Sequence, residues 1–256
     1  MEIIAHVIAL GAPMILLLIG VGFAAGFFNT VAGAGSLLTL PALMLAGLPA
    51  DAANATKRIG VLAQSFVGTV GFARAGVLDG KMLMRLAPIG VAGGILGAYL
   101  ATRVPERILK WVLLATLLEV AWMTATKRLT IAPEGPPPPR WKAMTMFFLV
   151  GVYGGFAQAG VGLLLLGVLA RTIRIDLVRA NAIKVAIVGL QTLAAVAVFA
   201  GAGDVRWREG GILAVGMMAG AAFAVRFAIK RSQWLERVAL VAVIVAVAAT
   251  ALRELV

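Results

Sequence analysis

Two sets of polar side chains with the same spacing interrupt an otherwise apolar sequence. Each set holds two amides and a lysine, and 127 residues separate the matched members, which are Asn54 and Asn181, Lys57 and Lys184, and Gln64 and Gln191. Amides can hold an anion through hydrogen bonds and an ammonium can hold it through charge. Because the offset is shared by three pairs, the pattern indicates an internal duplication.

A glycine-rich stretch with one polar amide precedes each set. The first reads GFAAGFFNTVAGAG (residues 22–35) and the second reads GVYGGFAQAGVG (residues 151–162). Glycine permits a sharp break in a helix and close approach of two backbones. We predict that the breaks bind substrate through Asn29, Gly33, Gly35 and Ser36 in the first copy and Gln158, Gly160 and Gly162 in the second.

Helices that begin at these breaks would add positive ends to the site. The segments starting at Ser36 and at Leu163 would direct free backbone N–H groups and the helix dipole toward a bound anion. Ser36 could cap its helix or donate to the bound group, and the sequence leaves both roles open.

The two lysines have two interpretations. A buried ammonium is costly unless a bound anion compensates it, whereas a lysine near a helix end can extend to the membrane surface. We expect Lys57 and Lys184 to supply charge to the substrate. Asn54 and Asn181 could bind substrate oxygens or bond between helices, and Gln64 and Gln191 are assigned to helix packing or a secondary role.

Carboxylates are few. Glu119 lies in the middle of an apolar stretch, where burial favours the protonated form, so it is the candidate proton carrier. The alternative is a neutral or lysine-paired residue without a transport role. Four aspartates are expected at helix ends or in loops, mainly as caps: Asp51, Asp79, Asp176 and Asp204.

Several other chemistries lack the residues they need. The chain has one histidine, His6, and no cysteine, and no cluster has metal-ligand spacing. The GAGS stretch at 33–36 lacks the GK[ST] ending of a phosphate-binding loop. We therefore expect no enzyme activity, metal or cofactor.

Composition places the chain in a lipid bilayer. It is 62% hydrophobic and 13% charged, with a mean hydropathy of +1.01, which is too apolar for a soluble domain. The net charge of +12 comes from cations scattered through short connections, so it indicates membrane topology and not nucleic-acid binding. The N-terminal stretch MEIIAHVIALGAPM lacks a basic start and a small-residue cleavage site, so no removable signal peptide is expected.

The apolar periodicity predicts an all-α integral membrane protein. Three segments are too short for full spans and resemble half-helices beside the breaks. The predicted helices cover 4–28, 36–47, 52–73, 82–102, 106–126, 141–157, 162–171, 177–201, 208–230 and 233–252.

A proline-rich linker divides the chain into two repeats. We predict an N-terminal repeat at 1–126, the linker at 127–140 and a C-terminal repeat at 141–256. If each repeat has one broken or re-entrant helix followed by three transmembrane helices, the second inserts upside down and the repeats are inverted. One face then carries about twice as many Lys and Arg residues as the other, which makes the linker face cytoplasmic. If the first and fifth elements instead span fully, the two faces nearly balance.

The first copy, GFAAGFFNTVAGAGSLLTLPALMLAGLPADAANATK, resembles the TauE/SafE sulfite exporters, also called the toluene sulfonate uptake permease family. The second copy, GVYGGFAQAGVGLLLLGVLARTIRIDLVRANAIK, fits the duplicated layout of that family. The second copy departs from the family pattern because its break is shorter and lacks the serine and proline. The first copy departs at Ala34, where the family frequently has a glycine. The resemblance implies a bacterial inner-membrane carrier of small sulfur-containing anions, with its site between the halves.

From these observations we expect an exporter of sulfite or an organosulfonate that works by alternating access. The expected partners are the small anion, membrane lipid and a possible second copy in a homo-oligomer, with no nucleic acid. Two alternatives stay open, which are a channel-like anion pore and a membrane scaffold that does not transport.

Overall fold

The computed structural model describes residues 11–31, 33, 35–105, 107–109, 111–112, 115, 138–173 and 175–230. This part of the chain consists of helices and short connections and has no strand, so the predicted all-α class is confirmed. Its helices are α2 (Gly11–Val31), α3 (Ser36–Leu45), α4 (Ala50–Arg74), α5 (Gly80–Ala101), α7 (Arg140–Phe156), α8 (Val161–Ile173), α9 (Leu177–Ala202) and α10 (Trp207–Lys230).

Most predicted helix bounds lie within two residues of those observed. The main difference is α2, which continues to Val31 beyond the predicted end at residue 28. Asn29 is therefore helical, and the chain turns only at Gly33, whose φ of +80° is left-handed. The predicted helices at 106–126 and 233–252 and the linker at 127–140 lie mainly outside the described residues.

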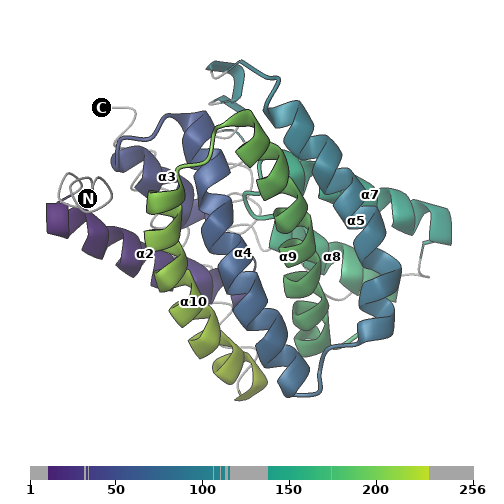
Figure 1. Cartoon of the computed structure of the whole chain (residues 1–256). Coiled ribbons are helices and arrows are strands. Elements are labelled where there is room, and N and C mark those ends of the chain that lie inside the picture. Colours follow the sequence, from purple (N-terminus) through teal and green to yellow (C-terminus); the bar gives the residue numbers. More distant parts are fainter. Residues whose placement is uncertain are drawn as a thin grey trace.

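α4 and α9 form the centre of the molecule and pack against each other (Figure 1). α10 packs on α4 and crosses α2, while α5 packs on α9 and crosses α7. The short helices pack in the same reciprocal way, α3 against α2 and α4, and α8 against α7 and α9. Each of these contacts thus has a counterpart in the other half.

Glycines allow the outer crossings to be close. Side-chain carbons added at Gly216 and Gly220 would meet the backbone oxygens of Ile19 and Phe23 on α2, and one added at Gly151 would lie 2.5 Å from the oxygen of Gly90 on α5. Such contact between backbones is typical of helix packing in membranes, where small residues replace hydrophobic burial as the basis of association.

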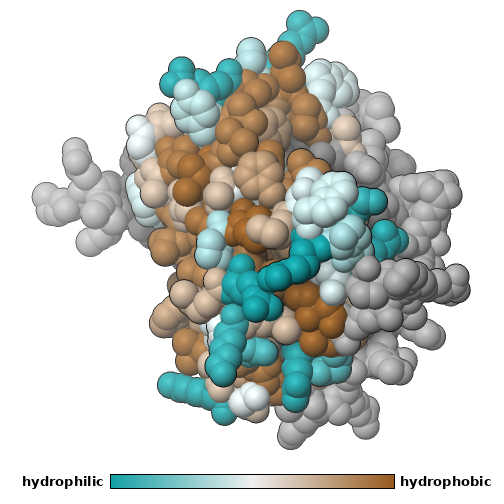
Figure 2. Space-filling view, turned by 90° about the vertical axis from the view of Figure 1, so that its right-hand side faces the viewer, coloured by the Kyte–Doolittle hydropathy of each residue, from teal (hydrophilic) through white to brown (hydrophobic). Residues whose placement is uncertain are grey.

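The surface and the interior have the polarity of a membrane protein. Four helices, α2, α5, α9 and most of α10, are long and apolar enough to cross a membrane by length and composition. Large apolar side chains such as Leu16, Phe66 and Met84 are exposed, and Figure 2 shows apolar side chains across much of one face. Buried polar side chains lie mainly on α4, on α9 and at the two breaks.

Two of the four predicted aspartate caps are observed. Asp79 accepts a hydrogen bond from the backbone N–H of Met82 at the start of α5, and Asp176 accepts one from that of Arg179 at the start of α9. Such caps satisfy N–H groups that have no partner within the helix. Asp51 lies in the first turn of α4, and Asp204 lies in the connection between α9 and α10.

Asp204 should make the stability of the protein depend on pH. Partial burial, and next the Asp51 carboxylate, raise the pKa of Asp204 above its ordinary value. The folded chain then holds this proton more tightly than the unfolded chain, so stability falls as pH rises through the raised pKa. We expect Asp204→Asn to unfold on the order of 1 °C higher than wild type at pH 7, with a smaller gain at pH 5. Thermal unfolding in detergent between pH 5 and 8 checks this, and a gain independent of pH would contradict it.

Candidate functional site

The first break joins α2 to α3. Gly33 leaves the helix with a left-handed φ, and its N–H donates to the backbone oxygens of Phe28 and Asn29 at 3.0 and 2.9 Å. Gly35 lies against the last turns of α2, because a side-chain carbon there would be 2.6 Å from Cβ of Asn29. The glycines in this break therefore serve both the turn and the close packing.

The second break joins α7 to α8. Gln158 and Gly160 both have positive φ, of 60° and 66°, and Gln158 is the non-glycine residue with this conformation among those described. Such backbone is strained for a side chain with a Cβ and has to be held by its surroundings. Gln158 is buried, and its amide donates to the Thr192 hydroxyl on α9 at 2.7 Å.

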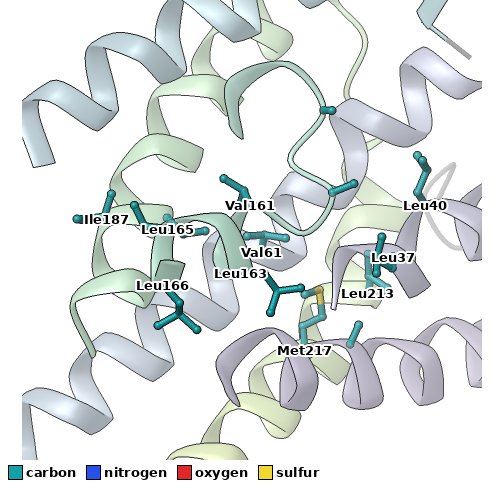
Figure 3. Close-up of a cluster of buried hydrophobic side chains, with 14 of the residues drawn as sticks. Leu37, Leu40, Val61, Val161, Leu163, Leu165, Leu166, Ile187, Leu213 and Met217 are labelled. Carbon is teal, nitrogen blue, oxygen red and sulfur yellow. The ribbon is translucent and has the colours of Figure 1, made fainter. Parts of the chain in front are cut away.

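The two breaks meet. A side-chain carbon added at Gly33 would fall on the backbone of Gly162, and one added at Gly162 would fall on Gly33. Around them lie apolar side chains of α3, α4, α8, α9 and α10, among them Leu37, Val61 and Leu163 (Figure 3). The chain thus brings its two interruptions to one place, although they are far apart in sequence.

Lys57 and Lys184 approach this place from the central helices. Each is the eighth residue of its helix, and both are buried, with 0% and 1% of the residue exposed. Their extension to the membrane surface is therefore ruled out. Lys57 donates to the backbone oxygen of Ala157 at 2.7 Å, and Lys184 donates to those of Asn29 and Thr30, both at 3.0 Å.

These bonds run crosswise between the halves. The lysine of the first half holds the end of α7, and the lysine of the second half holds the end of α2. The last carbonyls of a helix have no partner within it and carry the negative end of its dipole, so a cation stabilises them. Non-helical backbone inside a membrane needs such partners.

The predicted amides lie beside the lysines. The Asn54 side chain donates to the backbone oxygen of Phe156 at 2.9 Å, while its own buried oxygen has no hydrogen-bond partner in the described structure. The Asn181 side chain accepts from Lys184 at 2.8 Å. Asn54 therefore makes the helix-to-helix bond that was one of its two predicted roles.

The two glutamines pack between helices. Gln64 accepts from the Thr30 hydroxyl at 3.4 Å, which links α4 to α2. The Gln191 side chain fills the space left by Gly90 and Gly154, because side-chain carbons there would lie 2.6 and 3.1 Å from its amide group. Both positions agree with a role in helix packing.

Sequence reasoning missed Arg58. It is fully buried and donates to the backbone oxygens of Gly154, Gly155 and Phe156, and its guanidinium carbon lies 4.7 Å from the centre of the Phe199 ring. The 127-residue spacing does not reveal Arg58, because the matching residue is Val185. An arginine next to Lys57 in an apolar helix was the signal that could have revealed it.

Comparison with known proteins places this arrangement in a family. The sequence model of the family described as "Sulfite exporter TauE/SafE" matches residues 18–251. The chain belongs to the TauE/SafE family.

Relatives of this TauE/SafE chain carry related names. A "Probable membrane transporter protein ORF9" from Sinorhizobium sp. is 28% identical over 88% of this chain and 87% of its own. The "Probable membrane transporter protein YfcA" of Escherichia coli K12 is 27% identical over 88% and 85%, and a "Probable membrane transporter protein" of Haemophilus influenzae is 23% identical over 89% and 90%. The family and these names support a membrane transporter and not an enzyme.

The buried ionisable side chains beside the two breaks are basic. Lys57, Arg58 and Lys184 are the buried charged side chains in the described part of the chain, where no carboxylate is buried. A helix C-terminus carries the negative end of the helix dipole, so the ends of α2 and α7 suit the basic groups that bond them.

Two residues of the predicted site cannot be placed at the junction of the two breaks. The backbone of Ser36 begins α3, but its side chain is not among those described. Glu119 lies outside the described residues. Their predicted roles in capping or substrate binding and in proton coupling stay predictions.

Proposed function

We propose that the chain is a secondary transporter that exports small sulfur-containing anions, such as sulfite or an organosulfonate, across the bacterial inner membrane. The substrate class comes from the family description. The anion would bind between the halves, beside Asn29, Gly33, Gly35 and Ser36 of the first break and Gln158, Gly160 and Gly162 of the second.

One observation carries this proposal, which is that two broken helices meet beside buried basic side chains. The contact between Gly33 and Gly162 joins the breaks, and Lys57 and Lys184 lie buried beside them. Broken helices that meet between repeats are the usual binding sites of secondary transporters. An anion there would take N–H groups from the starts of α3 and α8 and charge from the lysines.

We also propose that the halves are inverted repeats that rock against each other. The reciprocal packing supports this, because α2 crosses α10 where α7 crosses α5, and α4 and α9 pack centrally. Rocking about that centre would expose the junction of the breaks to one side of the membrane and then to the other. Asn54 and Asn181 would contribute polar atoms to the bound anion, and the unpartnered oxygen of Asn54 suits a proton-bearing group.

The membrane potential favours export. With the cell interior negative, an outward-moving anion gains about 2.3 kcal/mol per charge for each 100 mV. Uptake would need a coupled cation, for which Glu119 is the proposed proton carrier. A homo-oligomer is compatible with this mechanism and is not required by it.

Counterflow in proteoliposomes tests the function. Vesicles loaded with sulfite, sulfate, thiosulfate, sulfoacetate, taurine, phosphate or lactate are diluted into labelled substrate, and uptake is followed against concentration. We expect saturable exchange for a sulfur anion, and an increase in the unfolding temperature of the purified protein with the same anion. Uptake that rises without saturation would instead indicate a channel. No uptake and no stabilisation with any anion would favour a scaffold.

A further inference from the structure

The end of α7 is bound by one face of α4. The last carbonyls of a helix lack partners within it, and four consecutive ones here all accept from α4. Arg58 donates to Gly154 at 3.0 Å, to Gly155 at 2.6 Å and to Phe156 at 3.1 Å. Asn54 also donates to Phe156, and Lys57 donates to Ala157. Residues three and four apart share a helix face, which explains how one turn of α4 supplies all of these donors.

Arg58 has a shape that fits this task. Its planar guanidinium carries five N–H groups in a fixed fork, whereas a lysine ammonium is a compact charge with rotating donors. The fork binds three carbonyls that follow the turn of α7, and the Phe199 ring lies against it. A lysine at position 58 would keep the charge but could not reproduce this pattern.

The first break has no arginine that matches Arg58. The residue that matches Arg58 is Val185, which is buried and lies against Gly68 on α4. In the described structure, the Lys184 side chain donates to the end of α2, where it bonds the backbone oxygens of Asn29 and Thr30. The two halves therefore differ here, although their helices pack in a reciprocal way.

We infer that Arg58 is the positioning residue that fixes the second break, so that Gln158 to Gly162 form the rigid side of the substrate site. Arg58 acts through the backbone of α7 and need not touch the anion. The consequence for transport rests on the proposed function, but the fixing of the break does not.

The chain has no cysteine, which permits a test with single reporters. Ala159→Cys reports on the second break and Val31→Cys on the first, since both residues are buried, at 0% and 3% exposed. Each reporter is combined with Arg58→Lys and Arg58→Met, and N-ethylmaleimide labelling is timed in membranes. Arg74→Lys, an exposed position on the same helix, is the control.

We expect labelling at position 159 to become about tenfold faster in Arg58→Lys, since buried carbonyls lose donors, with little change at position 31. Equal acceleration at both positions would indicate general loosening and would overturn the inference, as would wild-type labelling in Arg58→Lys. If Arg58→Met does not fold, Arg58→Lys carries the test alone.

Transport gives a second, separable readout. Where wild type shows saturable exchange, Arg58→Lys is expected to raise KM about tenfold with a smaller change in maximal rate, because the bound geometry is disturbed while the charge is kept. Unchanged KM would overturn the substrate-positioning part. If wild type transports none of the anions, the proposed function fails, while the labelling result still decides whether Arg58 fixes the break.

Discussion

Replacing Lys57 or Lys184 with methionine is expected to lower the affinity for the transported anion on the order of 100-fold, because a charge-assisted hydrogen bond worth about 3 kcal/mol is lost. Transport at substrate concentrations near the wild-type KM should then be abolished. Both effects follow from the position of the two buried lysines at the junction of the breaks.

The two replacements should differ in their cost to stability. Lys184 donates to the backbone oxygens of Asn29 and Thr30 and to the Asn181 side chain, whereas among the described residues Lys57 donates to the backbone oxygen of Ala157. Each buried acceptor left without a donor costs about 1–3 kcal/mol, and part of this is offset because a buried charge is removed. Lys184→Met should therefore unfold at a lower temperature than Lys57→Met.

Counterflow and thermal unfolding, each with and without the anion, measure both effects. Lys81→Met, at an exposed lysine at the start of α5, is the matched control and should behave as wild type. Stabilisation by the anion that persists in both buried variants would remove the lysines from the site. It would leave them only as caps of the broken helices.

The contact between the breaks gives the second large effect. Gly162→Ala places a methyl group on the backbone of Gly33, and overpacking of this kind costs about 1–3 kcal/mol. Gly33→Ala meets the same obstruction and also forces alanine to a φ of +80°, which adds about 1–2 kcal/mol. We expect Gly33→Ala to be the more destabilised variant and both to lose transport.

Two further glycines separate the two causes. Gly47 has a φ of +90° with open space around it, so the loss of stability in Gly47→Ala measures the cost of the left-handed backbone conformation without a steric clash. Gly167, within α8, has open space and no positive φ, so Gly167→Ala should be neutral or slightly stabilising. Thermal unfolding of the four variants measures the series. Equal losses in Gly162→Ala and Gly167→Ala would show that the breaks do not press on each other.

The helices were predictable because apolar stretches between short polar connections set their limits. α4, predicted at 52–73, is observed at Ala50–Arg74, and α9, predicted at 177–201, at Leu177–Ala202. The predicted end of α2 at residue 28 is wrong because the polar Asn29 does not interrupt the helix, which continues to Val31. The backbone conformation of Gly33 decides where that helix ends, and a residue type alone does not give φ.

The site was predictable in its members and not in its connections. The shared 127-residue spacing identified Lys57 and Lys184 as members of the site. The sequence of one half does not indicate which backbone carbonyl of the other half each lysine ammonium binds. Arg58 escaped notice for a related reason, since matching by repetition finds only what both copies keep. Such singular residues mark where two duplicated halves have come to differ.

The crosswise bonds also constrain how the chain is made. Lys184 follows Asn29 by 155 residues, so α2 reaches the bilayer during synthesis well before the residue that caps it has been translated. Until then its terminal carbonyls depend on water or on the insertion machinery. A fragment that contains only the first half should therefore insert into the membrane but not fold stably, and should be degraded by proteases. When the two halves are co-expressed as separate chains, both should accumulate as folded protein.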